Sequence, residues 1–408
     1  MMSKKSPQLR FEGFTDDWEQ RKLKDIVNRV TRKNKNLEST LPLTISAQYG
    51  LVDQITFFNK QIASKDMSGY YLLQKGEFAY NKSYSKDFPW GAIKRLNMYD
   101  EGVLSTLYIA FLPFKVNSDF LVSYYETDGW HKEVAIRAAE GARNHGLLNI
   151  TAVDFFDTGL MIPPNNDEQQ EIGGFFIELD HTITLHQRKL DLLKEQKKGF
   201  LQKMFPKNGA KVPELRFAGF ADDWELRKVG ELLTERNEQA PMNDEFPLMA
   251  FIANEGVAPK GERYDRSSLV NDTAGKLYKK TRFGDFIYSS NNLETGSIGL
   301  NKYGNASVSP VYSIFEATGI ADSDFIGRRL VRKDFINAMI KWRQGVVYGQ
   351  WKIHESDFVK IEVAVPSVDE QRQIGEFLDT LDQHITLHQR KLDLLKEQKK
   401  GYLQKMFV

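Results

Sequence analysis

Cysteine is absent from this chain of 408 residues. Its absence excludes disulfides, thiolate metal sites and a cysteine nucleophile, and it fits a protein that works in a reducing cytoplasm. The sequence also lacks any run of about eighteen apolar residues, so we expect no membrane span. The opening residues, MMSKKSPQLRFEGF, contain no apolar segment of the kind found in secretory signals. We therefore expect a cytoplasmic protein that does not enter a membrane.

An excess of charge of either sign is also missing. Lysine and arginine number 56 against 55 aspartates and glutamates, which gives a formal net charge of +1. Such a balance excludes a protein that coats DNA through bulk positive charge alone. Hydrophobic residues make up 41% of the chain, as in ordinary globular proteins, and the length allows two or three domains.

Catalytic motifs are absent as well. The chain has no G-x-x-x-x-G-K-[ST] loop for a nucleoside triphosphate and no H-E-x-x-H metal motif. The stretch IPPNN at 162–166 has the double proline of an amino-methyltransferase motif but lacks the flanking residues, and no F-x-G-x-G accompanies it. We therefore expect no catalytic residue and no metal ligand in this chain. A self-contained methyltransferase or nuclease would require such motifs.

Two blocks of sequence occur twice, and they divide the chain into two halves. The segment ITLHQRKLDLLKEQKKG stands at 183–199 and again, unchanged, at 385–401, within longer blocks (167–205 and 369–407) identical at 30 of 39 positions. The segment PQLRFEGFTDDWEQRK at 7–22 is repeated as PELRFAGFADDWELRK at 213–228. The residues between these blocks match only in fragments, such as GEFAY and GDFIY. The pattern indicates an internal duplication in which the middle of each half has diverged.

The longer repeated blocks are predicted to be helices that pair with each other. Their apolar residues alternate at spacings of four and three, the heptad pattern of a coiled coil. Prolines before each block and acidic residues at its start are typical of helix N-termini. A histidine interrupts the seam in each copy and is more plausibly a polar seam position than a metal ligand. The predicted seam residues of the helix pair are Ile183, His186, Leu190, Leu193, Ile385, His388, Leu392 and Leu395.

The repeat also predicts the direction of the two helices. If the halves are structurally equivalent, the second helix must end near an LRF segment, and the one available is at residue 9. The second helix must then run back toward the first half, antiparallel to the first helix. We therefore predict an α+β fold, with two similar globular domains separated by two long antiparallel coiled-coil helices and an internal pseudo-two-fold repeat.

Candidate DNA-binding residues lie in two loops of each middle segment. A polar loop follows each Gly-acid strand, at 81–95 and 289–302, and a second loop pairs Arg143-Asn144-His145 with Tyr348-Gly349-Gln350. Their lysine, arginine, serine and amide side chains are those that bond phosphates and base edges. Solvated surface loops remain the alternative interpretation. The candidates are Lys82, Ser83, Lys86, Lys94, Arg95, Arg143, Asn144, His145, Ser289, Ser290, Asn291, Asn292, Tyr348, Gln350 and Lys352.

The layout resembles the specificity subunits of type I restriction–modification systems. The resemblance covers the whole chain and is carried by LRFEGFTDDW at 9–18, LRFAGFADDW at 215–224 and the P…DEQ-x-x-I start of each helix block. It implies a non-catalytic protein whose two target-recognition domains each read one half of an asymmetric, split site in double-stranded DNA. It further implies that the helices set the gap between the half-sites and dock two modification (methyltransferase) subunits, which restriction (translocase and nuclease) subunits join.

The resemblance also implies where the domains and the cofactors lie. The first recognition domain with its LRF segment is expected at 1–165, the first spacer helix at 166–206, the second domain at 207–366 and the second helix at 367–408. No cofactor is expected on this chain, whereas S-adenosylmethionine, ATP and magnesium are expected on the partner subunits. The alternative function is a coiled-coil adaptor without sequence-specific DNA binding.

Overall fold

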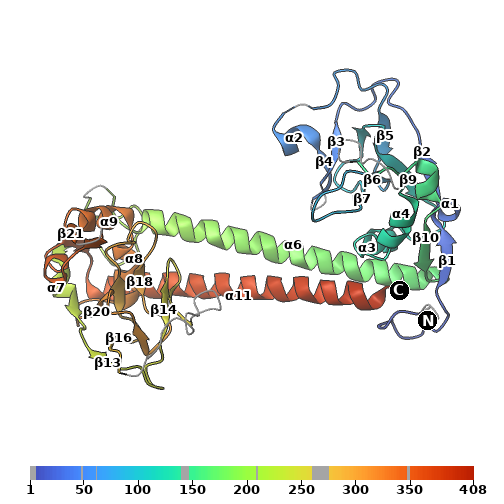
Figure 1. Ribbon diagram of the computed structural model, residues 1–408. Helices are drawn as coiled ribbons and strands as arrows, with labels where there is room; N and C mark the ends of the chain where they lie inside the picture. The colour runs from blue at the N-terminus through green and yellow to red at the C-terminus, as the bar shows by residue number, and fades with distance from the viewer. Residues whose placement is uncertain are drawn as a thin grey trace. The chain divides into compact units, whose positions relative to one another are not determined.

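The protein folds into two compact units, which a computed structural model describes over residues 6–46, 49–60, 62–138, 147–207, 210–259, 275–346 and 350–408 (Figure 1). One unit contains residues 1–187 and 390–408, and the other contains residues 188–389. Each unit therefore combines a globular domain with parts of two long helices, α6 (Asn166–Lys203) and α11 (Val368–Met406).

The globular part of the first unit is built from short strands and short helices. In chain order these are β1 (Glu19–Lys22), α1 (Leu23–Ile26), β2 (Val27–Val30), β3 (Leu43–Ser46), β4 (Gly50–Asp53), α2 (Gln54–Phe58), β5 (Tyr71–Gln74), β6 (Phe78–Asn81), β7 (Ala92–Arg95), β8 (Glu101–Leu104), β9 (Ile109–Pro113), α3 (Ser118–Tyr124), α4 (His131–Arg137), α5 (Ala152–Phe156) and β10 (Gly159–Ile162). A four-stranded antiparallel sheet has the order β2-β9-β6-β7, and the pairs β3-β4, β5-β8 and β1-β10 surround it.

The second unit repeats this plan with different loops. Its elements are β11 (Glu225–Lys228), α7 (Val229–Leu232), β12 (Leu233–Glu235), β13 (Gln239–Ala240), β14 (Ala250–Ile252), β15 (Gly256–Ala258), β16 (Tyr278–Thr281), β17 (Phe286–Tyr288), β18 (Ile298–Leu300), β19 (Ala306–Val308), β20 (Ser313–Ala317), α8 (Ser323–Leu330), α9 (Lys333–Ile340), β21 (Gln344–Val346), β22 (Gln350–Lys352), α10 (Glu355–Phe358) and β23 (Glu362–Val365). The sheet β12-β20-β17-β18 corresponds to β2-β9-β6-β7, and β11-β23 corresponds to β1-β10. The α+β duplication predicted from the sequence is confirmed.

Each unit contains the start of one long helix beside the end of the other. The core of the first unit includes Ile172 and Phe176 from α6 together with Met406 from α11. The core of the second unit includes the corresponding set, Met204 near the end of α6 and Ile374 and Leu378 from α11. Burying these apolar side chains in the domain cores, away from water, stabilises the attachment of both helices to each domain.

Side-chain contacts within each unit give the direction of the helices. In the first unit Phe175 packs edge-on against Tyr402 with ring centroids 5.1 Å apart, and Lys399 Nζ lies 2.5 Å from Asp180. The partner's residue number falls as the α6 number rises, so the helices are antiparallel. In the second unit the equivalent contacts are Phe377 with Phe200 and Asp382 with Lys197. The antiparallel direction predicted from the repeat is therefore found in both units.

The LRF segment and the DEQ segment are parts of one structural joint. Arg10 donates from Nε and Nη2 to the two carboxylate oxygens of Glu168, at 2.6 and 2.7 Å, and the Glu168 side chain is fully buried. The backbone N–H of Leu9 donates to the carbonyl of Lys405 at 2.9 Å. The second unit repeats the joint with Arg216 and Glu370. Each LRF segment thus connects the start of one long helix to the end of the other.

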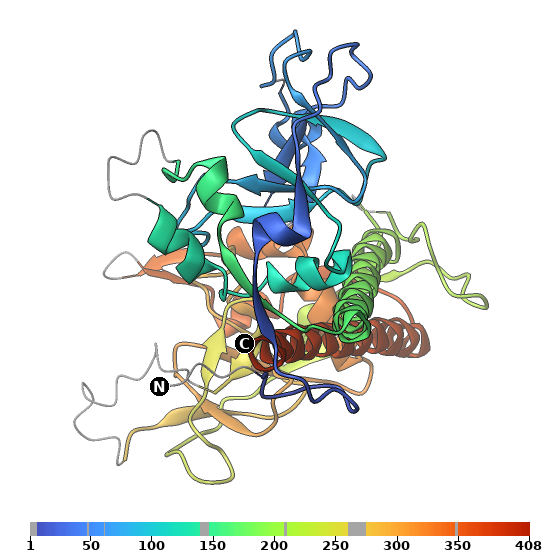
Figure 2. The same cartoon turned by 90° about the vertical axis from the view of Figure 1, so that its right-hand side faces the viewer.

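The glutamine of each DEQ segment fastens the long helix to the domain. Gln169 accepts a hydrogen bond from the N–H of Asn117, the residue that caps α3, and donates to the carbonyl of Pro163. The close approach of α3 to α6 depends on Gly173 of α6, because a Cβ added there would lie 2.5 Å from the backbone N atom of Phe120 in α3. Figure 2 shows α3 lying directly beside α6 at this end of the first unit.

Candidate nucleic-acid interface

The two candidate loops of the second unit meet in the structure. Ser290 Oγ accepts a hydrogen bond from the N–H of Ile353 at 2.9 Å, and Asn291 Oδ1 accepts one from the N–H of Trp351 at 2.6 Å. The loop after β17 is thereby bound to β22, the second strand of the hairpin β21-β22. Side chains that lie some 60 residues apart in the chain form one surface.

An open pocket of about 430 Å³ lies where these loops meet. Four carboxamide side chains line it, from Asn237, Gln239, Asn291 and Gln350. A carboxamide can donate and accept at once, which is the pattern needed to bond the N6 and N7 atoms of adenine in the major groove. The pocket therefore has the chemistry of a surface that reads base edges.

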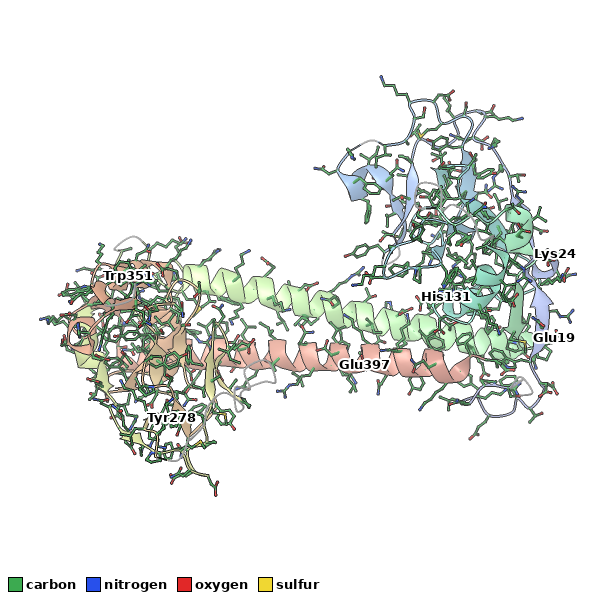
Figure 3. All side chains as sticks on the ribbon, in the orientation of Figure 1. Glu19, Lys24, His131, Tyr278, Trp351 and Glu397 are labelled. Carbon is green, nitrogen blue, oxygen red and sulfur yellow. The ribbon has the colours of Figure 1, made fainter. Side chains whose placement is uncertain are left out.

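Apolar and charged groups complete the lining of this pocket. Trp351, labelled in Figure 3, is 48% exposed and Val311 is 69% exposed, so both present apolar surface to solvent. Glu355 also lines the pocket; although burial opposes ionisation, a hydrogen bond from Ser313 and the nearby lysines Lys352 and Lys279 lower its pKa. Glu355 is therefore ionised at neutral pH and can accept hydrogen bonds. Exposed apolar groups of this kind can contact a thymine methyl group.

Ser289 and Asn292, the other candidates of this loop, have different surroundings. Ser289 is 6% exposed and its N–H donates to the carbonyl of Ser297 at 2.8 Å. Asn292 is exposed and lies outside the residues that line the pocket. Lys352 is exposed and does line it. The pocket thus brings together Ser290, Asn291, Gln350 and Lys352 but not all the candidates of the second unit.

In the first unit backbone bonds join the loop after β6 to the segment that begins at residue 147. The N–H of Leu148 donates to the carbonyl of Lys82 at 2.9 Å, Ser83 forms an isolated antiparallel bridge with Leu147, and Lys82 Nζ donates to the carbonyl of Ile150. Lys86 is exposed in the turn that follows. In the first unit the loop after β6 is therefore bound to residues 147–150, which follow the second candidate loop in the chain.

Two neighbouring candidates on β7 differ in their bonding. Arg95 Nη1 donates to Asp119 at 2.6 Å and to Ser118 at 2.8 Å, and its side chain is 14% exposed. Those bonds hold β7 against the start of α3, so the guanidinium of Arg95 is already occupied. Lys94 is half-buried and forms no ion pair among the described residues.

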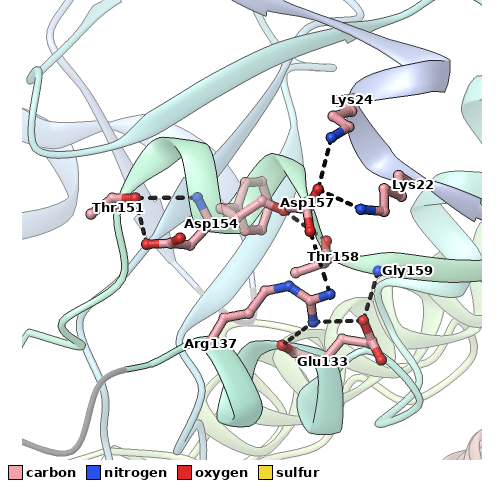
Figure 4. Close-up of polar contacts among 10 residues, drawn as sticks. Lys22, Lys24, Glu133, Arg137, Thr151, Asp154, Asp157, Thr158 and Gly159 are labelled. Atoms are coloured by element: carbon pink, nitrogen blue, oxygen red, sulfur yellow. Dashed lines mark hydrogen bonds and ion pairs between the residues drawn. The ribbon is translucent and has the colours of Figure 1, made fainter.

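Arg143, Asn144, His145 and Tyr348 lie outside the described residues. The chain leaves α4 shortly before the first three, and a cluster of polar contacts holds this end of α4 (Figure 4). Arg137 donates to Glu133 at 2.7 Å, and Glu133 accepts from the N–H of Gly159 at 2.7 Å. Nearby, Lys22 and Lys24 both donate to Asp157 at 2.8 Å, and their hydrogen bonds lower the pKa of Asp157 to about 2.

The predicted helix seam includes the most buried residues at the centre of the long helices. Leu190 and Leu392 are each 1% exposed, Leu193 is 5% and Leu395 is 6% exposed. The other four, Ile183, His186, Ile385 and His388, are half-buried. His384 and His388 stand one helical turn apart on α11, a spacing that could contribute two metal ligands. Across the described ranges, however, no group of three or more His, Cys, Asp or Glu side chains is arranged to hold a metal ion.

Sequence reasoning missed several pocket residues, among them Asn237, Gln239, Val311 and Trp351. Trp351 could have been found, because YGQWKIHESDF aligns with HGLLNITAVDF of the first half and a tryptophan in such a polar loop is unusual. The others come from strands and turns that carry no local signal. In the described part of the chain, none of the helices is both long enough and apolar enough to cross a membrane.

Comparison with known proteins finds similarity to type I restriction–modification specificity subunits. The sequence profile of the type I restriction modification DNA specificity domain matches residues 221–397. The MjaX type I restriction enzyme specificity subunit of Methanocaldococcus jannaschii is 21% identical over 94% of this chain and 91% of its own length. The MjaVIII specificity subunit of the same organism is 23% identical over 49% of this chain and 44% of its own length.

A solved structure shares the fold of the whole chain. The S subunit of the type I restriction–modification system from M. genitalium superposes with a TM-score of 0.58 at 14% identity, and the match covers 99% of each chain. The match to the specificity domain is consistent with the internal duplication. The structure shows that duplication in its two related domains and in the repeated joints between LRF and DEQ segments. Over nearly its whole length the chain is therefore similar to the specificity subunits of type I restriction–modification systems.

Proposed function

We propose that each globular domain reads one half of a split DNA site and that the two long helices set the gap between the halves. The observation that carries the proposal is the convergence of two polar loops in the second unit. In the second unit this convergence creates the carboxamide-lined pocket around Asn291 and Gln350. Domains that share their strands and differ in these loops suit two half-sites of different sequence.

We further propose that the helices dock two modification subunits through one repeated surface. Leu185 and Leu192 stand seven residues apart on α6, and Leu387 and Leu394 occupy the identical positions of α11. All four are about half exposed or more, at 50, 51, 64 and 52%. Residues seven apart share one face of a helix, and exposed leucines in a soluble protein are typical of partner surfaces. Two equal patches can bind two copies of one partner.

The chemistry of the complex would then belong to the partners. In this proposal the modification subunits supply the S-adenosylmethionine site and methylate adenine. The restriction subunits use ATP and magnesium to translocate and cleave DNA, and the assembly works in the cytoplasm. This chain supplies double-stranded DNA sequence recognition without a catalytic residue of its own.

The proposal is tested by methylome mapping. The chain is co-expressed with its modification subunits in a host without other adenine methylation, and methylated adenines are mapped across the genome. We expect one bipartite motif with a fixed gap. Exchange of residues 23–166 for those of a relative should alter one half of the motif only. Methylation that ignores sequence, or a motif altered in both halves, would contradict the proposal.

A further inference from the structure

A second cavity lies in the first unit, between the globular domain and the last turns of α11. Its volume is about 540 Å³. Phe88 and Lys94 line it from the candidate loop and β7, Trp130 lines it from the segment before α4, and Lys396, Lys400 and Leu403 line it from α11. One wall of the cavity is therefore formed by a loop predicted to bind DNA, and the opposite wall by a spacer helix.

Three lysines of this cavity have no ion-pair partner. Among the described residues, Lys94, Lys396 and Lys400 form no ion pair and no hydrogen bond through their ammonium groups, although burial raises the pKa of Asp180 and the charge of Lys94 acts to lower it. Lys396 and Lys400 are exposed and four residues apart, so they share one face of α11. An ammonium group that lines a cavity and lacks a protein partner is suited to bind an anion.

The equivalent lysines of the second unit are differently placed. The strand registers place Gly299 at the position of Lys94, so the second unit has no lysine there. On α6, Lys194 donates to Gln389 at 3.4 Å, and Lys198 lies 3.6 Å from Glu195. Lys194 and Lys198 thus occupy the same helix positions as Lys396 and Lys400 but contact protein groups. They are matched controls for substitutions of Lys396 and Lys400.

The acidic groups of the cavity lie on its domain side. Asp87, Glu126 and Asp128 line that side, and Glu126 is paired with Lys399 at 2.6 Å. Burial lowers the pKa of His131, which also lines the cavity, so this histidine is neutral at pH 7 and adds no charge. The helix side contributes lysines Lys396, Lys399 and Lys400 and no acid. An anion in the cavity would therefore bind against the helix.

A buried donor in the cavity wall has no acceptor. Trp130 is 4% exposed, and its indole Nε1 forms no hydrogen bond with the described residues. Buried polar groups in folded proteins are nearly always bonded, so this donor is an unusual polar group in the cavity wall.

We infer that Lys94, Lys396 and Lys400 bind a phosphodiester of the DNA backbone beside the first half-site, so that the spacer helix itself contacts DNA. The inference rests on the proposed function, because it takes DNA as the source of the phosphate. The candidate loop that forms one wall would bring the backbone to the cavity. A phosphate contact adds affinity without sequence preference and releases counterions from the DNA.

The experiment measures the salt dependence of DNA binding by the full chain in complex with its modification subunits. Binding to a duplex with the mapped site is followed by fluorescence anisotropy between about 50 and 200 mM salt. The double variant Lys396→Gln/Lys400→Gln should weaken binding and reduce the slope of log K against log salt by about 0.9 for each lost phosphate contact. The control Lys194→Gln/Lys198→Gln, at the same positions of α6, should keep the parental slope.

Each outcome decides the inference. An unaltered slope in the cavity variant, or an equal reduction in the control, would overturn it, since the cavity would then contribute nothing of its own. Titration with AMP in the absence of DNA gives a further arm: AMP binding that the cavity variant loses, with no change in slope, would assign the site to a free nucleotide and also overturn it. A parent complex without selective binding would overturn the proposed function as well.

Discussion

Arg10 and Glu168 form a two-bonded ion pair at the base of the first globular domain, with both carboxylate oxygens of Glu168 engaged and its side chain fully buried. Trp18 Nε1 donates to the same carboxylate at 3.3 Å. Arg216 and Glu370 repeat the pair in the second unit. The two motifs that identify each half of the sequence therefore meet in a single contact, whose role is to fix the LRF segment to the start of a long helix.

Removing one partner of this pair should be costly. Arg10→Met leaves the carboxylate of Glu168 buried without a cation, which in comparable pairs costs about 3–5 kcal/mol. We expect a lower melting temperature for the chain in complex with its modification subunits, measured by scanning calorimetry. The double variant Arg10→Met/Glu168→Met removes both charges and should recover much of the loss. A double variant as unstable as the single one would show that the pair's charge is not what matters.

The buried seam leucines should be required for the integrity of the helices. Leu190→Asp places a carboxylate at a position that is 1% exposed, at a cost of several kcal/mol unless the carboxylate is protonated. We expect loss of the assembled complex in size-exclusion chromatography with light scattering, and the same result for Leu392→Asp. An intact complex would contradict the placement of the seam.

The exposed leucines should behave in the opposite way. Leu192→Glu and Leu394→Glu change side chains that are 51 and 52% exposed, so the free energy of unfolding should change by less than about 0.5 kcal/mol. Modification subunits should nevertheless dissociate, as measured by analytical ultracentrifugation. Leu192→Met and Leu394→Met, which keep the apolar surface, serve as controls. Full assembly of the glutamate variants would exclude this face as the docking surface.

The pocket around Gln350 should read bases of one half-site. Replacing Gln350 with alanine removes a carboxamide, and a lost bidentate base contact reduces discrimination by about 1–3 kcal/mol. Methylome mapping should then show a relaxed preference at one base pair of the second half-site. The first half-site provides the internal control, because its domain is unchanged. Relaxation in both halves would mean that the substitution acts through the fold.

Acid should weaken the cluster around Asp157. Hydrogen bonds from Lys22 and Lys24 lower the pKa of this carboxyl from 3.8 to about 2 in the folded protein. Because the pKa of Asp157 is lower in the folded than in the unfolded protein, its ionised carboxylate stabilises the fold. This stabilisation is complete above about pH 4, where the carboxyl is ionised in both states, and is lost as the pH falls toward 2. The contribution is small, since the group is exposed. The difference in melting temperature between the parent and Asp157→Asn should shrink over that interval.

The sequence was sufficient to predict the helices, their direction and the duplication. The reason is physical: a helix seam repeats every three or four residues, so Leu190 and Leu193 are visible locally. Arg10 and Glu168 each lie in a block that occurs twice, but the pairing of these two residues was not predicted from the sequence.

The recognition surface was harder to predict because it is assembled from distant segments. Asn237 reaches the pocket from the segment between β12 and β13, Gln239 from β13, and Val311 from the turn before β20. Strands of three or four residues give too little periodicity to fix which side chains face the same way. Arg95 illustrates the same difficulty, since its partner Asp119 belongs to a helix that only the folded domain brings near. Its role in DNA binding stays a prediction, as does that of the other candidates.

The joint has a consequence for how genes of this kind can change. Arg10 with Glu168 and Arg216 with Glu370 present the same chemistry to whichever domain lies between them, and ITLHQRKLDLLKEQKKG is unchanged in both copies. Exchange of one copy of this stretch for the other therefore leaves every helix position unchanged. A different domain flanked by the same LRF and DEQ segments would form the same contacts with the long helices. Under the proposed function, replacing one whole domain would therefore change one half-site without compensating substitutions in the helices.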